Sequence, residues 1–337
     1  MRVGAELVRA SQVYAKEDVG TTWRLLLGTL APIAALWALV LSTDLWWLEL
    51  PSSVLLGLIG VRLFIFFHDY CHDAIFTDSK LGGAVMSAVG FYTLSVTSVW
   101  RETHNYHHRN NAKLTGSAIG SYPTVTLAMY RGLTVADRRK LKAIRHPITI
   151  ALGLFTTFFI GFCYAAFRRD PKQHWAAPVS GLVWIAVFVA LGLSAGWGDA
   201  VWLWMLPCAL HAGLGSYLFY AQHNFPGIEL RGRREWEYSH AALRCSSMFD
   251  MSPMMHWFTG NIGFHHVHHL NHRIPFYRLP EAMAGMEELQ DPIRTSWRLS
   301  DIRAALACSV WDGDAGRMIS FEEADAAVAS AVAAAAK

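Results

Sequence analysis

The residues of this chain most able to do chemistry are histidines grouped in three short motifs, HDYCH, HNYHH and HHVHH. Residues three or four apart share one face of a helix, so HxxxH and HxxHH direct their imidazoles toward one point. By this spacing the predicted metal ligands are His68, His72, His104, His107, His108, His265, His268 and His269. His266, the extra member of the third motif, points off the shared face and is expected to support the other rings.

Neutral imidazole binds iron, zinc, copper or nickel. A histidine cluster without a metal would bury many polar rings, each of which needs a hydrogen-bond partner. A single HxxxH pair is more often a surface or core pair than a metal site, but three such motifs in one chain leave little room for chance. Because four-coordinate zinc takes at most four ligands, eight rings predict two metal ions rather than one.

The elements that position these motifs are predicted to be membrane helices. The 337 residues are 53% hydrophobic and 16% charged, against about 25% charged in an ordinary soluble domain. A mean hydropathy of +0.24 and 14 tryptophans also fit an integral membrane protein. The net charge of +3 is too small to indicate a nucleic-acid partner. Five cysteines without a CxxC pattern predict neither disulfides nor a zinc ribbon, and Cys71 is expected only to pack.

Four apolar stretches are predicted to cross the membrane: Leu25–Leu48, Ser53–Phe67, Pro178–Leu193 and Ala200–Tyr220. In this interpretation Trp46 and Trp47 end the first crossing at an interface, and Pro51 restarts the chain. Leu81–Trp100 is too rich in Gly, Ser and Thr for a confident span, so it is expected to lie under the site or to re-enter.

A fifth apolar stretch, Pro147–Phe167, must not cross, because the third motif would then lie on the opposite side from the first two. The basic residues that follow it place it at the cytoplasmic leaflet. We therefore predict an all-α integral membrane protein with four transmembrane helices, membrane-surface helices and a cytosolic cap that carries the histidine motifs. Both termini are expected in the cytoplasm.

Residues 1–337 are expected to form one domain, with a core at about 24–298 and a cytosolic C-terminal tail at 299–337. Within the tail, Phe321–Lys337 is expected to be a loose helix or disordered. Arg231–Asp250, which includes Arg233, is a predicted cytosolic cap. The basic segment Arg131–Arg145 could dock an acidic partner, although a solvated or lipid-facing surface is the simpler interpretation. Arg62, inside the second span, is expected to snorkel or to face the helix bundle.

The three motifs in an apolar chain resemble the membrane fatty acid desaturase superfamily, from about Val61 to Pro280. The stretch WFTGNIGFHHVHHLNHRIPFYRLPEA is similar to bacterial acyl-lipid desaturases of the Δ12/ω-6 type. The element AQHNF resembles one that the family carries before its third motif, which implies His223 as a ninth ligand. The resemblance further implies a non-haem site with two irons (Fe), O2 as co-substrate, and an acyl chain, favoured in a membrane glycerolipid, that receives a cis double bond.

This chemistry is consistent with the residues, because removing hydrogen from an unactivated methylene needs an oxidant stronger than any side chain. Neither an HPGG haem motif nor GxGxxG occurs, so a separate electron donor is expected, with ferredoxin favoured for a bacterial-type protein in the inner membrane. Side chains that could hold the outer N–H of a ligand ring, or could instead be ordinary caps, are Asp69, Asp73, Glu102, Asn105, Asn261, His266 and Asn271.

The remaining histidines are not expected to bind metal. His256 and His272, near the third motif, are interpreted as packed or surface residues, and His146, His174, His211 and His240 fit no motif. Three alternatives to a desaturase stay open. Related hydroxylases or ketolases of alkanes or carotenoids share the motifs, although IPFYRLPE favours acyl lipids. A metal transporter should place ligands near mid-membrane, and an inactive membrane scaffold is the third alternative.

Overall fold

Four long apolar helical segments form one end of the molecule. The computed structural model describes residues 2–114, 119–232 and 234–335. The long segments are α2 (Val19–Leu41), α3 (Trp46–Cys71), α10 (Ala176–Ser194) and the run formed by α11 (Trp197–Ala200), the π-helix η3 (Val201–Met205) and α12 (Leu206–Ala221). Each is long and apolar enough to cross a membrane. The prediction of four transmembrane helices is thereby confirmed.

The boundary between the first two spans differs from the prediction. The helix α2 ends at Leu41, and α3 begins at Trp46, so the two tryptophans start the second span instead of ending the first. Pro51 lies inside α3, where a membrane helix tolerates proline because its surroundings can satisfy the freed carbonyl. The polar residues Ser42–Asp44 make the break.

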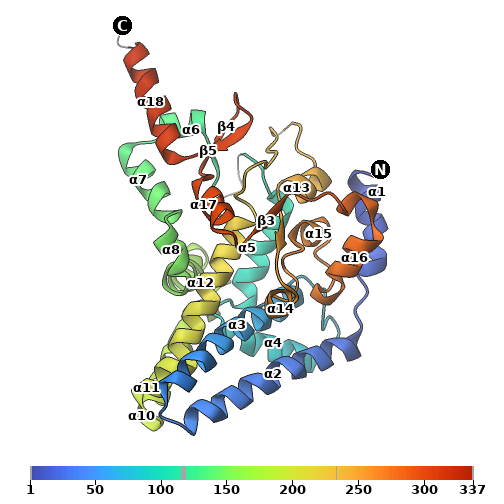
Figure 1. Ribbon diagram of the computed structural model, residues 1–337, viewed down its shortest axis with the longest axis vertical. Helices are drawn as coiled ribbons and strands as arrows, with labels where there is room; N and C mark the ends of the chain where they lie inside the picture. Colours follow the sequence, from blue (N-terminus) through green and yellow to red (C-terminus); the bar gives the residue numbers. More distant parts are fainter. Residues whose placement is uncertain (1, 115–118, 233, 336–337) are drawn as a thin grey trace.

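The helix α3 is the centre of the bundle and packs against both α2 and α12 (Figure 1). Two glycines allow the close approach of α12. A Cβ atom at Gly57 would lie 2.7 Å from the Cβ of Leu210, and one at Gly60 would lie 3.1 Å from Nδ1 of His211. Small residues at such contacts let membrane helices pack by van der Waals interaction.

Two stretches that we did not expect to cross have irregular geometry. The first consists of α4 (Lys80–Tyr92) and α5 (Thr97–Asn110), which meet at a bend of 86°. The second consists of α8 (Pro147–Ala151), the π-helix η2 (Leu154–Ala165) and α9 (Ala166–Arg169). Figure 1 shows this second stretch nearly end-on and α12 from its side, so the two run across each other. That direction fits a segment lying along a membrane surface.

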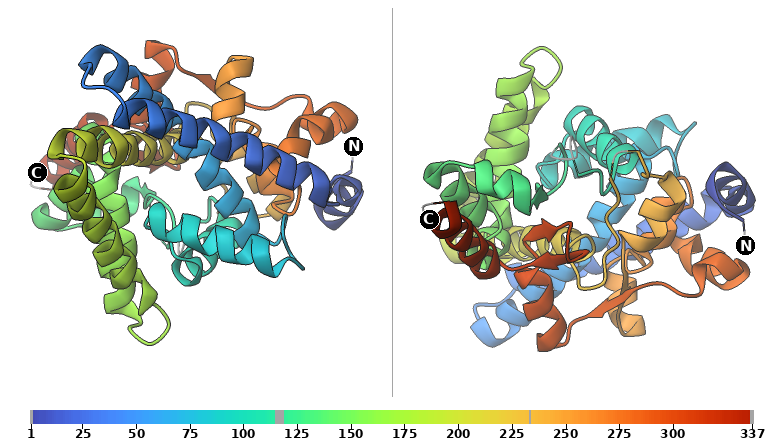
Figure 2. Two further views of the ribbon diagram at one scale, coloured as in Figure 1. Left: turned by 90° about the horizontal axis from the view of Figure 1, so that it is seen from below. Right: turned by 90° about the horizontal axis from the view of Figure 1, so that it is seen from above.

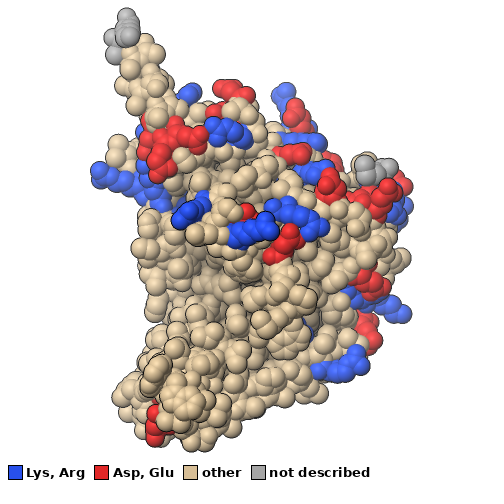
Figure 3. Space-filling model, viewed as in Figure 1, with Lys and Arg blue, Asp and Glu red and all other residues tan. Residues whose placement is uncertain are grey.

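Charged side chains gather at the opposite end of the molecule, as Figure 3 shows, while the surface over the long helices is almost free of them. This polar end is built of short elements: α1 (Gly4–Ala10), η1 (Ser11–Tyr14), α6 (Leu127–Gly132), α7 (Val135–Ile144), α13 (Tyr238–Arg244), α14 (Pro253–Phe258), α15 (His265–Leu270), η4 (Phe276–Arg278), α16 (Leu279–Gly285), η5 (Glu287–Leu289), α17 (Leu299–Ala307) and α18 (Phe321–Ala335). Arg233 of the predicted cap lies outside the described residues.

Two small sheets, which the sequence analysis did not anticipate, join distant parts of the polar end. Strand β1 (Val125–Thr126) pairs in parallel with β4 (Val310–Asp312), which pairs antiparallel with β5 (Arg317–Ile319). Strand β2 (Met248–Asp250) pairs in parallel with β3 (Arg294–Ser296). Strands of two or three residues are too short to leave a readable alternation in the sequence. In the C-terminal segment, α18 packs on α6, and Asp325 of α18 accepts a hydrogen bond from the hydroxyl of Tyr130 at 2.7 Å.

Candidate metal centre

The three histidine motifs lie where spans or cap helices end near one another. His68 lies in the last turn of α3, and His72 follows that helix as its C-terminal cap. The second motif occupies α5 and the third occupies α15, while His223 follows the end of α12. Since α3 and α12 pack side by side, their ends bring the first motif and His223 to the same region.

The structure gathers these rings into two adjacent clusters. The first cluster holds His68, His72, His104, His108 and His268, whose candidate ligand atoms all lie within 4.8 Å of one another. The second holds His107, His223 and His269 by the same measure. His265 joins it, since its Nε2 lies 2.9 Å from Nε2 of His223. The rings of His108 and His269 stack at 4.2 Å between centroids, so the clusters touch.

The Nε2 atoms face one another in a way that ordinary hydrogen bonds do not explain. In the first cluster, Nε2 of His104 lies 2.9 Å from that of His68 and 3.2 Å from that of His108. In the second, Nε2 of His223 lies 3.0 Å from that of His107. The Nδ1–H of His68 donates to the carboxylate of Asp69 at 2.9 Å, and that of His223 donates to the Cys245 carbonyl at 3.2 Å. Both Nε2 atoms therefore carry lone pairs that point at other ring nitrogens.

One metal ion bound in each cluster would explain why these Nε2 lone pairs point at one another. His72 is buried with neither ring nitrogen hydrogen-bonded among the described residues, and Nε2 of His269 is likewise without a partner. Burial, and then the neighbouring rings, lower the pKa of His265, His268 and His269 well below the ordinary value, which keeps them neutral. Burial lowers the pKa of His223 to about 4. Neutral imidazoles whose inward-facing nitrogens lack an ordinary hydrogen-bond donor are a fitting donor set for transition metals.

Two of the expected supporting side chains touch the clusters. Asp69 fixes the His68 ring, and its second oxygen accepts a hydrogen bond from the backbone N–H of Phe276 at 2.6 Å. Asn105 lies beside the His72 ring without a hydrogen bond of ordinary geometry. His266 instead donates from Nε2 to the Leu289 carbonyl at 3.2 Å, so it ties α15 to η5.

The other expected supports bond elsewhere. Asp73 pairs with Arg101 at 2.9 Å, Asn261 donates to the Phe276 carbonyl at 3.2 Å, and Asn271 donates to the Ser11 hydroxyl at 2.9 Å. Glu102 accepts hydrogen bonds from Arg169 at 2.9 Å and from His174 at 2.6 Å. His174, which fits no sequence motif, is therefore a fully buried partner of α5.

An apolar cavity of about 420 Å³ opens onto both clusters. His68 and His104 of the first cluster and His265 of the second lie in its wall. The remaining wall is mostly apolar and includes Trp100, Phe158 and Phe219 from α5, η2 and α12. Its size and lining are those of a site for a small apolar ligand or for one acyl chain.

Comparison with known proteins identifies the family. Residues 44–299, most of the chain, match the family described as fatty acid desaturase. The chain belongs to the fatty acid desaturase family. Membership establishes the activity class, and it accounts for the histidine clusters and for the apolar cavity beside them. A desaturase also implies a lipid substrate and an electron donor.

Several named proteins are similar to this desaturase. A fatty acid desaturase of Bacillus subtilis is 29% identical over 320 residues, which cover 94% of this chain and 90% of that protein. A sn-1 oleoyl-lipid 12-desaturase of Synechocystis is 22% identical, covering 64% of this chain and 63% of that protein. A sn-1 acyl-lipid omega-3 desaturase (ferredoxin) of Nostoc is 21% identical, covering 72% and 68%.

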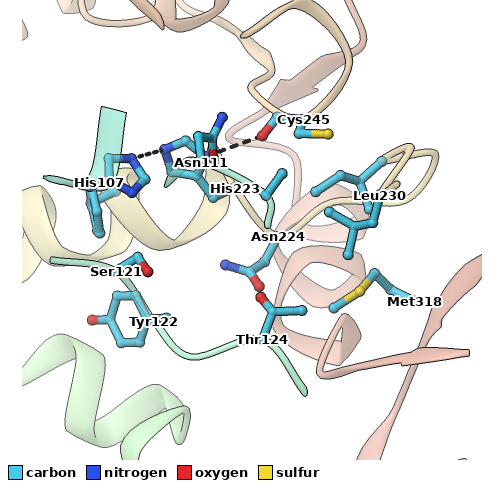
Figure 4. A pocket seen from close by; sticks show the side chains of 13 residues that line it. His107, Asn111, Ser121, Tyr122, Thr124, His223, Asn224, Leu230, Cys245 and Met318 are labelled. Atoms are coloured by element: carbon cyan, nitrogen blue, oxygen red, sulfur yellow. Dashed lines mark hydrogen bonds between the residues drawn. The ribbon is translucent and has the colours of Figure 1, made fainter. Parts of the chain in front are cut away.

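A second, smaller pocket of this desaturase adjoins the second histidine cluster (Figure 4). Its wall includes His107 and His223, whose Nε2 contact is drawn there, and the neutral polar side chains of Asn111, Thr124 and Asn224. Like the apolar cavity, it is lined by Ser121, Tyr122 and Phe219. The two spaces are therefore neighbours that share part of one wall.

Two histidines that the sequence analysis set aside lie close to these features. His272 has its ring centroid 4.7 Å from that of His72 and 5.0 Å from that of His108. His211, on α12, is buried and lines the apolar cavity away from the clusters. No local motif in the sequence marked His211 as a cavity residue. Arg62 faces the bundle, donating to Thr29 at 3.0 Å and to the Trp257 carbonyl at 2.6 Å.

Proposed function

We propose that this desaturase uses O2 at two non-haem irons to introduce a cis double bond into a fatty acyl chain of a membrane glycerolipid. The proposed position of the new double bond is Δ12/ω-6. The observation that carries the proposal is the apolar cavity whose wall contains His68, His104 and His265, members of both clusters. A methylene chain lying there would pass directly beside both metal positions.

The proposed ligands of the first iron are the five histidines of the first cluster, and those of the second are His107, His223, His265 and His269. The irons, when bound and reduced, supply with O2 the oxidant that removes hydrogen from unactivated carbon. Asp69 holds the His68 ring with Nε2 toward the metal position. The aromatic wall of Trp100, Phe158 and Phe219 excludes water and restricts where the chain can lie.

The Δ12/ω-6 position is supported by the sequence around the third motif and by the 12-desaturase named among the relatives. An omega-3 relative of nearly equal identity means that the position must be measured. We would express the chain in a host that contains only saturated and monounsaturated lipids, and locate new double bonds by mass spectrometry. A new double bond on the methyl side of an oleoyl bond is expected, while an oxygenated product would indicate a hydroxylase instead.

The control in this experiment is His268→Ala, which removes one ring of the first cluster. We expect this variant to make no new product and to bind less iron in a metal analysis of the purified protein. If His268→Ala keeps full activity and full iron content, the assignment of the ligands is wrong even if the wild-type product is as proposed.

We further propose that the histidine clusters and both termini face the cytoplasm of a bacterial inner membrane, and that ferredoxin supplies the electrons. The charged surface at the polar end supports this orientation, because basic segments stay on the cytoplasmic side. The name of the Nostoc relative supports the donor. A reporter fused after residue 337 tests the orientation: alkaline phosphatase should be inactive there and a fluorescent protein should be fluorescent.

A further inference from the structure

A groove on the polar surface leads to the first histidine cluster. It has a volume of about 600 Å³ and lies between α1, α13 and the residues that follow α15. The helices α1 and α13 contact each other along one side of it, and Figure 2 (right) shows both at the same edge of the molecule. Its wall includes Arg9, Tyr238, His272 and Arg273.

His272 connects this groove to the metal centre. It is half-buried, whereas the neighbouring rings of His72 and His108 are only 3% and 1% exposed. Its ring lies against both of them, at 4.7 and 5.0 Å between centroids. Its Nδ1 has no hydrogen-bond partner among the described residues, so no internal bond explains its position. One imidazole therefore spans the distance from the groove to the ligand rings.

Among the described residues, the charged side chains of the groove that form neither an ion pair nor a hydrogen bond are positive. Arg9 and Arg273 are exposed, and neither forms an ion pair within the described part of the chain. The one acidic group in the wall, Glu237, is engaged at the start of α13. Its carboxylate accepts hydrogen bonds from the backbone N–H groups of Ser239 and His240 at 2.9 and 2.7 Å. An acidic surface would therefore be attracted to this groove.

Two other surfaces are less suited to a protein partner. On the basic helix α7, Lys142 pairs with Asp325 at 2.5 Å and Arg138 donates to two backbone carbonyls, so only part of its charge, such as that of the exposed Arg139 and Lys140, is left to attract a partner. In Figure 1, α7 and α1 lie at opposite sides of the polar end, and α15 lies nearer to α1. Among the described residues, the wall of the small pocket beside His107 and His223 contains no Lys, Arg, Asp or Glu side chain.

We propose that an acidic one-electron carrier protein docks over this groove and that its electrons reach the metal centre through His272. The inference rests on the proposed function, whose reaction needs an outside electron source. A –CH2–CH2– unit, O2, two protons and two electrons become –CH=CH– and two water molecules. The carrier is oxidised once for each electron, so two docking events serve each double bond.

The test uses the iron-loaded full chain and a reduced plant-type ferredoxin as the probe, with the metal centre's reduction followed by stopped-flow absorbance. Dithionite, which needs no docking site, is the reference reductant. For Arg9→Glu with Arg273→Glu, we expect the half-saturating ferredoxin concentration to rise about tenfold or more, with dithionite reduction unchanged. The matched control is Arg139→Glu with Lys140→Glu on α7, both exposed, which should change neither value.

A second variant tests the route of the electrons. His272→Leu should slow reduction at saturating ferredoxin about tenfold while iron content, measured by mass spectrometry, stays that of the wild type. Loss of iron in this variant would make His272 a ligand and overturn the inference, as would an unchanged rate. So would a larger effect of the α7 variant than of the groove variant.

The inference and the proposed function can fail separately. If dithionite-reduced wild-type enzyme with O2 makes no unsaturated chain, the proposed function is wrong whatever the groove does. If it makes the product, but ferredoxin reduces the groove variant and His272→Leu as fast as the wild type, only the docking site and the route are wrong.

Discussion

The sharpest test of the apolar cavity as the acyl site is a substitution that fills it without disturbing the protein. Gly215 lies on α12 in the cavity wall, and a Cβ atom added there would have no heavy atom within 4 Å. Gly215→Leu should therefore place its side chain in the open space. Replacing glycine inside a helix also favours folding, by about 0.8 kcal/mol on helix propensity.

The size of the effect follows from the space that the leucine takes. A chain that must share this space with the leucine is overpacked, at a cost of about 1–3 kcal/mol. This corresponds to a decrease of roughly 5-fold to 150-fold in kcat/KM for chains long enough to reach Gly215. Shorter chains, which never occupy that part of the cavity, should keep their rate. The preferred chain length therefore shifts downward.

The assay is product formation from lipids of graded acyl length, by mass spectrometry, with purified variants reduced by dithionite so that donor binding plays no part. The matched control is Gly28→Leu on α2. Gly28 is also inside a spanning helix with open space at its Cβ position, but it is exposed on the outer surface. We expect Gly28→Leu to behave as the wild type at every chain length.

The apolar cavity does not hold the acyl chain at Gly215 if folded, iron-loaded Gly215→Leu handles every chain length as the wild type does. An equal loss of long-chain activity in Gly28→Leu would also contradict this site, because a leucine in any spanning helix would then be harmful. A uniform loss over all chain lengths in Gly215→Leu alone would place the substrate elsewhere and would indicate damage at the metal centre.

Three further predictions follow from individual contacts. Asp69→Asn removes the charged acceptor of the His68 Nδ1–H, so iron affinity should fall about 10–100-fold in a chelator competition, while Asp73→Asn, which only loses an exposed pair with Arg101, should keep its iron. Arg145→Met leaves the carbonyl of Pro123 and the side-chain oxygen of Asn224 without their buried donor, so the free energy of unfolding should fall by about 3 kcal/mol, and an equal fall in the exposed-residue control Arg139→Met would contradict this. Hydrogen bonding to Arg2 lowers the pKa of Glu288 from 4.5 to about 2, so this contact stabilises the fold fully above pH 4.5 and progressively less as the pH falls toward 2. Thermal unfolding of Glu288→Gln should show a weaker pH dependence in that window, and an unchanged slope would show that the contact is not the cause.

The spacing of the histidines predicted which rings meet within a motif, but not how the rings of the three motifs are divided between the two clusters. His104 and His108, four residues apart, have Nε2 atoms 3.2 Å from each other, as an HxxxH pair on one helix face should. His107 lies between them in sequence yet contacts His223, which follows α12. That division depends on how α5 packs against α12, and no local pattern contains that information. Similarly, Glu102 bonds to Arg169 and His174 because the chain folds back after η2.

The prediction of helices and strands was limited in the same way, to what local sequence contains. Four apolar stretches of sufficient length predicted four spans, because length and apolarity are local properties. The break between α2 and α3 was misplaced because proline and tryptophan were given more weight than the short polar run at Ser42–Asp44. The strand pairs that join β1 to β4, and β2 to β3, connect residues far apart in the chain, and strands this short have no period of their own.

Arg145 connects residues that are far apart in the sequence to the residues around the site. In the sequence it is one more basic residue of a polar segment, but it is buried and joins three parts of the chain. It donates to Pro123 in the wall of the apolar cavity, to Asn224 beside His223, and to Cys308 in the C-terminal segment. The pairing of β1 with β4 holds the same wall from its other end. Met318, beyond the family match, lines the small pocket beside the second cluster (Figure 4). The C-terminal segment is therefore part of the wall of the small pocket, and through Arg145 and β1 it also supports the wall of the apolar cavity.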